Sequence, residues 1–287
     1  MKTSTRICVL GSINLDLIIQ TQDLPQAGQT VGGGEFSVLP GGKGANVAVA
    51  AKRLGADVLL CGATGMDSYA EQARVTLEGL GVDLSKVVKL SDTPTGVAFI
   101  NVSDVGENQI AVASGANGAF QPQHIGDIQA DALITQFEIP IETIEAALKT
   151  FEGFVCVNPS PVCEGLDRLL PYTDLIVVNE GEFAAYENKL NSFSGKIVIT
   201  LGACGAELRE SGILIAKAMP PKVDVIDTTG AGDAFAAAIT TALAEGQSPQ
   251  EALQFACVVG ALTTTQLGTQ TASPERTAVE TVLEEIL

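Results

Sequence analysis

The sequence predicts an α/β protein with a mainly parallel central sheet. Short apolar runs typical of buried strands alternate with longer stretches typical of helices, which is the pattern of a parallel α/β sheet. The apolar runs lie at residues 7–10, 58–61, 132–134, 154–157, 175–178 and 197–199. The helical stretches lie near residues 42–54, 68–80, 141–151, 231–245, 248–266 and 274–286. No repeat, low-complexity tract or linker interrupts residues 1–287, so we expect a single domain.

Two segments depart from this rhythm, at about residues 14–39 and 95–113. Both carry alternating patterns punctuated by glycine, as in the stretch from Gly96 to Val102. The stretch Asp104–Asn108 has the residues of a hairpin turn and is followed by a further apolar run. These patterns predict strands that interrupt the strand–helix alternation of the rest of the chain.

Composition excludes several classes of partner. The 287 residues include 34 Asp and Glu against 16 Lys and Arg, a net charge of −18, which repels nucleic acid and anionic membranes. Asn14 and Asp16 interrupt the first apolar stretch, so we expect no signal peptide or membrane span. The six cysteines lack metal-binding spacing and fit free thiols of a reducing compartment. We therefore expect a cytoplasmic protein that binds neither nucleic acid nor membrane.

The segment from Asp227 to Asp233 places a carboxylate among small residues where an Ala-rich helix begins. The first turn of a helix has unpaired N–H groups and a positive dipole end, and glycine lets a phosphate approach them closely. Asp233 could accept a proton from a hydroxyl. The amides that would hold the developing negative charge are those of Gly230, Ala231 and Gly232. The segment predicts phosphoryl transfer to an alcohol; the alternative is a glycine-rich turn with Asp233 as an ordinary helix cap.

A second glycine-rich segment, Gly41–Asn46, also leads into a helix. It lacks the Gly-Lys-Ser/Thr ending of a Walker A loop and the spacing of a dinucleotide-binding loop. Its backbone can approach a polyhydroxylated ligand closely, with Lys43 and Asn46 as donors. Upstream, Asn14 and Asp16 follow the first strand and point to the same side of an extended segment. This pair suits sugar hydroxyls; the alternative is a plain turn.

With these motifs, the chain resembles the ribokinase (PfkB-type) carbohydrate kinase family. Gly41–Asn46 resembles the first family signature, and Asp227–Asp233 resembles the second, including its Gly-Ala-Gly-Asp core. Two long signatures in the correct order are far more specific than one glycine motif, and the resemblance covers nearly all 287 residues. Shorter segments that also resemble the family are Gly11–Asp16, Gly106–Asn108 and Gly115–Asn117.

The resemblance implies a fold and an activity. The fold would be a three-layer sandwich, with residues 14–39 and 95–113 forming a β lid over the sugar and a homodimer interface. The activity would be ATP-dependent phosphorylation of the primary hydroxyl of a small sugar, with D-ribose, giving D-ribose 5-phosphate, as first candidate. Another sugar, a nucleoside, or a non-catalytic binding protein of the same fold are the alternatives. The low aromatic content, 5%, disfavours a nucleoside, which would need a stacking surface.

The resemblance also implies roles for individual residues. The sugar would be held by Asn14, Asp16, Gly42, Lys43, Asn46, Glu138 and Asp233. ATP would contact Asn179, Thr200, Leu201, Gly202, Ala203, Cys204, Gly205 and Gly232. Glu182 would bind Mg²⁺ through water, although Asn179 and Glu182 would equally suit a helix cap. An activating K⁺ would be bound by Asp227, Thr229, Thr263, Gln266 and Gly268, with Ala272 where the family often has serine.

The connection between Asn179 and Thr200 is shorter than the family usually has, because an additional helix commonly occupies this interval. A parallel crossover needs about a dozen residues or more, so the connection is tight. We expect a missing layer here that leaves part of the sheet exposed, or covered by a partner chain.

Overall fold

The computed structural model describes residues 4–286. Its main sheet has nine strands in the order β13-β12-β11-β10-β9-β8-β1-β4-β5. The strands are β1 (Arg6–Leu10), β4 (Asp57–Gly65), β5 (Asp83–Leu90), β8 (Ala132–Gln136), β9 (Phe154–Asn158), β10 (Leu175–Asn179), β11 (Lys196–Thr200), β12 (Ala206–Glu210) and β13 (Ile213–Ala218). Neighbours from β11 to β5 pair in parallel, whereas β12 and β13 add an antiparallel edge.

All six predicted strands of this sheet are observed, and β5, β12 and β13 are the ones that the apolar pattern missed. Ile213, Leu214 and Ile215 at the start of β13 are exposed, and most of β5 is half-buried, so neither strand has the fully buried core of an inner strand. A continuous apolar run is typical of a strand that is buried on both faces. It therefore does not identify strands at or near the edge of the sheet.

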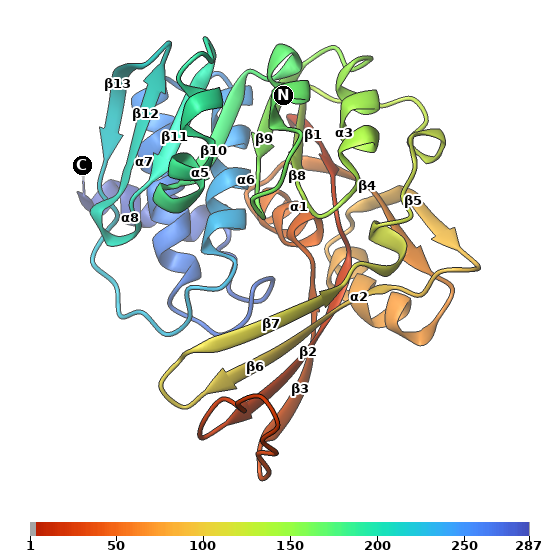
Figure 1. The fold of residues 1–287 in the computed structure, drawn as a ribbon. Helices are drawn as coiled ribbons and strands as arrows, with labels where there is room; N and C mark the ends of the chain where they lie inside the picture. The colour runs from red at the N-terminus through yellow and green to blue at the C-terminus, as the bar shows by residue number, and fades with distance from the viewer. Residues whose placement is uncertain (1–3, 287) are drawn as a thin grey trace.

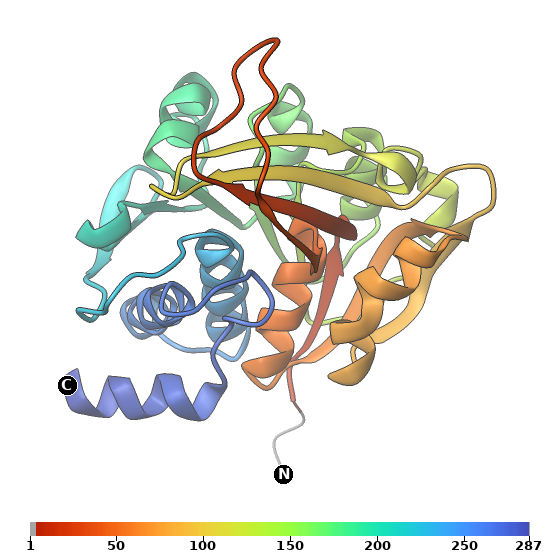
Figure 2. The ribbon, with the colours of Figure 1, turned by 90° about the horizontal axis from the view of Figure 1, so that it is seen from below.

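Helices cover both faces of the sheet and make it the middle of three layers (Figure 1). The helices are α1 (Lys43–Arg53), α2 (Ser68–Gly79), α3 (Ile141–Leu148), α4 (Leu166–Leu169), α5 (Glu180–Leu190), α6 (Ala231–Ala244), α7 (Pro249–Thr263) and α8 (Arg276–Ile286). Short 3₁₀ turns are η1 (Gly115–Asn117), η2 (Pro122–His124), η3 (Leu170–Tyr172) and η4 (Gly202–Cys204). Ile7 and Val9 pack on the side of α1, α6 and α7, while Cys8 and Leu10 pack on the side of α3 and α5. Figure 2 shows α1 beside the blue C-terminal helices. The three-layer prediction is confirmed.

The prediction that a layer is missing between Asn179 and Thr200 is wrong. Helix α5 begins at Glu180, directly after β10, so no loop residues separate the strand from the helix. The crossover therefore contains a helix of 11 residues. Tyr186 and Leu190 of α5 join Ile176 and Ile197 in one buried cluster. The chain therefore covers this face of its own sheet.

The smaller sheet extends away from the body as an arm (Figure 1). It contains β2 (Asn14–Thr21), β3 (Glu35–Gly41), β6 (Gly96–Ser103) and β7 (Asn108–Ala113) in the order β3-β2-β6-β7. These strands occupy the two segments where the sequence pattern changes. Asp16 pairs with Ala98, which pairs with Val112, so these three side chains share one face of the sheet.

The strand order of the main sheet reverses next to β1. After β1 the chain adds β4 and β5 on one side, and it then adds β8 and the later strands on the other. In open α/β sheets, ligands bind outside the carboxyl ends of the strands at such a reversal. The topology therefore points to the segments that follow β1 and β8.

Candidate active site

Three carboxylates from distant parts of the chain converge at this edge: Asp16 on β2, Glu138 after β8, and Asp233 in the first turn of α6. Lys43, the first residue of α1, joins two of them. Its backbone N–H donates to Glu138 Oε2 at 3.1 Å, and its Nζ lies 3.6 Å from Asp233 Oδ1. Asn46 Nδ2 donates to Asp233 Oδ2 at 2.9 Å. The two glycine-rich segments are thus brought into contact.

Glycines allow this approach at two helix starts. Gly42 precedes α1 with φ 92°, and a Cβ there would lie 2.7 Å from the backbone nitrogen of Asn14. Gly230 precedes α6 with φ 79°, and a Cβ there would lie 3.0 Å from Thr269. Both positions need a left-handed backbone, which glycine adopts without steric cost. The helix starts can therefore lie against the strands and loops that carry the polar residues.

Asp16 is the least satisfied of the three carboxylates. Its side chain is 9% exposed, and no hydrogen bond to it is found among residues 4–286. Burial, followed by the charges of Glu138 and Asp233, raises the pKa of Asp16 to about 7. Asn46 Oδ1 is also buried without a partner in this part of the chain. A ligand with several hydroxyls would supply the missing donors.

Asp233, by contrast, is well supplied with donors. It is 5% exposed and accepts from Asn46, with the Lys43 ammonium beside its other oxygen. Asp233 raises the pKa of Lys43 more than any other group does, so the lysine stays charged. Next to it, the exposed start of α6 contains Ala231, half-buried, and Gly232, exposed. The amide of Ala231 donates to Thr228 O at 3.3 Å. A buried carboxylate beside a helix start can take a proton from a hydroxyl while the positive end of the helix faces developing negative charge.

Two further polar residues belong to this site, and the residue-by-residue assignment from sequence missed both. Asn117 Nδ2 donates to Asn14 Oδ1 at 2.7 Å, and Asn117 Oδ1 accepts from Ile13 N at 2.9 Å, which fixes the Asn14 amide. Ser12 Oγ donates to Glu138. Both lie in segments that resemble the family, so a buried polar residue in such a segment was the available signal.

On the nucleotide side, the structure brings the predicted residues to the same edge of the sheet. Asn179 and Glu182 form a reciprocal cap of α5, since Glu182 N donates to Asn179 Oδ1 at 2.8 Å and Asn179 N to Glu182 Oε2 at 2.9 Å. The helix-cap alternative is therefore real, and contact with ATP or Mg²⁺ stays a prediction. The charge of Glu182 also raises the pKa of Lys43, after the larger effects of Asp233 and Glu138.

The predicted nucleotide loop links β11 to β12. Thr200 ends β11, and Leu201 N donates to Gly205 O at 2.8 Å across a turn whose tip is exposed. The tip consists of Gly202, Ala203 and Cys204. The turn closes at Gly205, where φ is 88°. The loop is open to solvent at the carboxyl end of the sheet, so an extended ligand could reach it from Asp233.

Only part of the predicted K⁺ set comes together. Asp227 Oδ1 accepts from Thr229 N at 2.9 Å and Oγ1 at 2.6 Å, and Asp227 Oδ2 accepts from Gly268 N at 3.2 Å. Thr263 instead donates its hydroxyl to Val259 O within α7. Gln266 is exposed, and Ala272 is buried. Asp227, Thr229 and Gly268 thus share one loop junction, and K⁺ binding by the predicted set stays a prediction.

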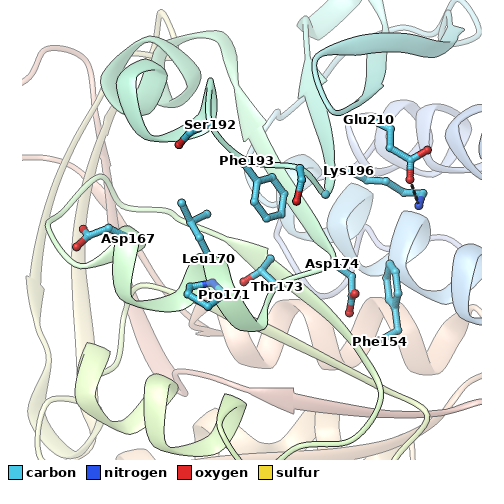
Figure 3. Close-up of a pocket in the computed structure, with 12 residues that line it drawn as sticks. Phe154, Asp167, Leu170, Pro171, Thr173, Asp174, Ser192, Phe193, Lys196 and Glu210 are labelled. Carbon is cyan, nitrogen blue, oxygen red and sulfur yellow. Dashed lines mark hydrogen bonds and ion pairs between the residues drawn. The ribbon is translucent and has the colours of Figure 1, made fainter.

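A cavity of about 660 Å³ lies at the opposite end of the sheet (Figure 3). Its lining includes Phe154, Asp174 and Lys196, which stand at the amino ends of β9, β10 and β11. Lys196 is paired with Glu210 at 2.8 Å, and Asp174 accepts from Val155 N at 2.8 Å. The charged groups shown in Figure 3 are therefore engaged within the fold, far from the three carboxylates.

Comparisons with known proteins agree with this geometry. Residues 4–276 match the family model described as pfkB family carbohydrate kinase. Ribokinases of Schizosaccharomyces pombe and Bacillus subtilis are each 34% identical to this chain; 96% of this chain is covered in both cases, with 96% and 99% of the relatives. A ribokinase structure from Thermotoga maritima superposes with a TM-score of 0.88 at 31% identity, covering 98% of this chain and 99% of its own.

The structure of an Arabidopsis thaliana ribokinase, described as complexed with ribose and ATP, has a TM-score of 0.84 at 28% identity and covers 98% of this chain and 99% of its own. Within residues 4–286, no helix is long and apolar enough to cross a membrane. The family model spans the signatures at Gly41–Asn46 and Asp227–Asp233 and the three carboxylates between and around them. The chain belongs to the pfkB family of carbohydrate kinases.

Proposed function

We propose that this kinase transfers the γ-phosphoryl group of ATP to the primary hydroxyl of D-ribose, giving D-ribose 5-phosphate. The observation that carries the proposal is the contact of Asp233 with Lys43 and Asn46, opposite a buried, unpartnered Asp16. The site thus offers a proton acceptor, Asp233, together with a hydrogen-bond acceptor, Asp16, that is available to sugar hydroxyls. The names of the relatives, ribokinases at 33–34% identity over nearly the whole chain, support ribose as the acceptor.

The sugar would lie between β2 and α1. Asp16 would accept from two hydroxyls and Asn46 Oδ1 from another. Asn46 Oδ1 is buried without a donor, and Asp16, which is 9% exposed, accepts no hydrogen bond within the described residues. Asn14, held by Asn117, and Glu138, held by Ser12 and Lys43, would orient the far end of the ring. Gly42 would bring its backbone close to the ligand. Since each such hydrogen bond to a charged group is worth about 1.5–3 kcal/mol, the set favours a neutral polyol.

In the reaction, Asp233 takes the proton of the attacking hydroxyl as the oxygen bonds to phosphorus and the bond to the ADP oxygen breaks. Lys43 stays protonated beside Asp233 and offsets its negative charge. The transferring phosphoryl faces the amides of Gly230, Ala231 and Gly232. ATP extends from there along Asn179 and the loop Thr200–Gly205. Positioning and electrostatics supply most of the rate.

Two cations fit the donors that are present. Glu182 is a half-buried carboxylate beside this edge, and it would hold Mg²⁺ through water, since Mg²⁺ keeps several waters in such sites. Mg²⁺ supplies charge neutralisation for the phosphates. For K⁺, the side-chain oxygens of Asp227 and Thr229 lie together, and Asp227 also accepts from the backbone N–H of Gly268. The next residue, Thr269, lies against Gly230 at the start of α6. K⁺ bound there would fix the start of α6 without touching the sugar.

The protein would act as a homodimer through the lid. Exposed apolar side chains occupy both lid faces: Ile19, Phe36 and Phe99 on one, Ile110 and Val112 on the other. Such a surface on a flat sheet favours pairing with a second copy. We expect Phe99→Asp to lower the mass in light scattering from a dimer to a monomer, and an unchanged mass would reject the lid as the interface.

We place the protein in the cytoplasm, because all six cysteines are free thiols.

The test is ATP consumption coupled to product identification by mass spectrometry. The acceptors are D-ribose, 2-deoxy-D-ribose and D-fructose, each with and without K⁺. We expect ribose to have the highest kcat/KM and K⁺ to raise it. 2-Deoxyribose is the second candidate, because a deoxyribokinase of Salmonella typhi is 30% identical with 93% of this chain covered. Preference for another acceptor would keep the chemistry and reject ribose; binding without turnover would reject the kinase proposal.

A further inference from the structure

The segment 267–273, between α7 and α8, lies against the start of α6. Gly268 N donates to Asp227 Oδ2 at 3.2 Å. Thr269 is so close to Gly230, the residue before α6, that a Cβ on Gly230 would lie 3.0 Å from it. The turn that leads into α6 runs from Asp227 to Gly230, so both of its ends contact this segment. The position of the segment therefore determines where the positive end of α6 lies.

Arg53, the last residue of α1, holds the other side of this segment. Its Nη1 donates to the backbone carbonyl of Thr271 at 3.2 Å and to that of Ser273. Within residues 4–286, the hydrogen bonds from the segment 267–273 to the rest of the chain go to Asp227 and Arg53. The Arg53 side chain is 20% exposed, and a charged donor makes stronger hydrogen bonds than a neutral one. The segment is thus held between the turn before α6 and the end of α1.

The sugar-binding end of α1 is fixed without Arg53. Along this helix Arg53 lies about 15 Å from Lys43, at 1.5 Å per residue. Lys43 N donates to Glu138 Oε2 at 3.1 Å, and Ala45 N donates to Ser12 O at 2.9 Å. These bonds hold the first turn of α1 against the residues that follow β1 and β8. Loss of the Arg53 guanidinium should therefore displace the start of α6 and leave the proposed sugar contacts in place.

We propose that Arg53 is a positioning residue for phosphoryl transfer, which acts through the segment 267–273 and holds the start of α6 where the transferring group is stabilised. This proposal rests on the proposed phosphorylation of ribose. Arg53 is remote from the sugar end of α1, so its effect passes through the backbone of the segment. A displacement of about 1 Å at a reacting centre can lower a rate about 100-fold. The effect should therefore appear in kcat and not in sugar binding.

The test begins with Arg53→Met, which keeps the aliphatic part of the side chain and removes both hydrogen bonds to the segment. It should lower kcat for ribose by about 10–100-fold. The KM for ribose, and the Kd measured by calorimetry without ATP, should change less than about twofold, as expected for an interaction that matters only in the transition state. Arg53→Lys keeps a charged donor, so its kcat should lie between those of Arg53→Met and the parent protein.

Arg276→Met is the matched control. Arg276 donates to both carboxylate oxygens of Glu245 at 2.7 Å and to Leu54 O at 3.0 Å, so it links the ends of α6 and α1 without a hydrogen bond to the segment 267–273. This variant should lower the unfolding temperature at least as much as Arg53→Met does and leave kcat within about twofold of the parent value. Equal losses of kcat in the two variants would overturn the proposal. A rise in the KM for ribose that matches the fall in kcat would also overturn it.

Hydrogen exchange tests the same contact without any substrate. The amides of Asp227 and Gly268 are both hydrogen-bonded where the segment meets the turn before α6. Peptides that contain them should exchange faster in Arg53→Met than in the parent protein or in Arg276→Met. Unchanged exchange in Arg53→Met would overturn the proposal. If no acceptor is phosphorylated, the proposed function fails, and exchange still decides whether Arg53 holds the start of α6.

Discussion

Charged residues gather at both ends of the strands of the main sheet. Those at the amino ends (the amino edge) and those at the carboxyl ends (the carboxyl edge) differ in burial and in pairing. At the amino edge, Lys196 pairs with Glu210 at 2.8 Å and Arg6 with Asp57 at 3.3 Å, and the four side chains are 29–45% exposed. At the carboxyl edge, Asp16 and Asp233 are 9% and 5% exposed. Two of the three carboxylates there have donors, and Asp16 has none within the described residues.

This difference shows which edge is built for a ligand. Exposed pairs contribute about 0–1 kcal/mol and need no further partner. A buried carboxylate without a partner is costly, and structures retain such groups mainly where a ligand or substrate satisfies them. The cavity at the amino edge is larger than the one lined by Asn14 and Glu138, about 660 Å³ against about 390 Å³, yet its charges are already engaged. A carboxylate without any partner, not cavity size, distinguishes the two edges.

The largest expected effect is at Asp233. Asp233→Asn keeps the side-chain volume but removes the proton acceptor, so kcat should fall by roughly 10²–10⁴-fold, the usual contribution of a general base. The matched control is Glu210→Gln at the amino edge, for which kcat should stay within twofold. Steady-state turnover and circular dichroism of both variants would check this. Comparable kcat values in the two variants would remove Asp233 from the reaction.

Asp16 comes second. Asp16→Asn should raise the KM for ribose by about 10–100-fold, because a charged acceptor of hydrogen bonds is lost. The same change should stabilise the empty protein. In the folded protein Asp16 keeps its proton up to about pH 7, whereas in the unfolded chain it loses the proton above about pH 3.8. The free energy of unfolding therefore falls as the pH rises between these two values. Removing this loss is worth up to about 4 kcal/mol above pH 7.

Thermal unfolding at pH 5 and pH 8 would separate the two effects of Asp16→Asn. The gain in stability over the parent protein should be less than half as large at pH 5 as at pH 8. An equal gain at both pH values, or a loss at pH 8, would show that Asp16 is not the strained group at this edge.

A third effect is the pH dependence of sugar binding. Asp16 faces Glu138, Asp233 and Lys43, and sugar hydroxyls that donate to it favour its ionised form. Below about pH 7 binding therefore has to release a proton, so ribose affinity should fall by up to about tenfold per pH unit and level off above pH 7. Calorimetry in buffers of different ionisation enthalpy would count the proton. A flat profile, or one that persists in Asp16→Asn, would contradict this origin.

The smallest effect is expected at the amino edge. Lys196→Met breaks the pair with Glu210 and should change the free energy of unfolding by less than about 1 kcal/mol, with no change in kcat or KM. Denaturant unfolding and the coupled assay would check both. A change in KM here would mean that the two edges communicate, and the contrast between them would have to be revised.

The sequence predicted much of this because its strongest signals are local. Continuous apolar runs identified the inner strands, and glycine followed by an Ala-rich stretch identified the starts of α1 and α6. Asn14 and Asp16 were placed on one side of a strand by the period of two alone. The edge strands β5 and β13 and the adjacent strand β12 were missed, because they lack the doubly buried pattern. Helix α5 was missed, because its weak amphipathicity gave no periodic signal in a short interval.

What the sequence determined by itself is therefore the fold class, the two glycine-rich segments and the types of residue that we propose for the chemistry. Only the tertiary structure decided which carboxylate has donors, that Asn117 and Ser12 hold Asn14 and Glu138, and that a cavity is lined by Asn14 and Glu138. The physical reason is range: propensity and periodicity act over a few residues, whereas burial, charge pairing and empty space depend on segments that meet only when the sheet, the helices and the lid are assembled.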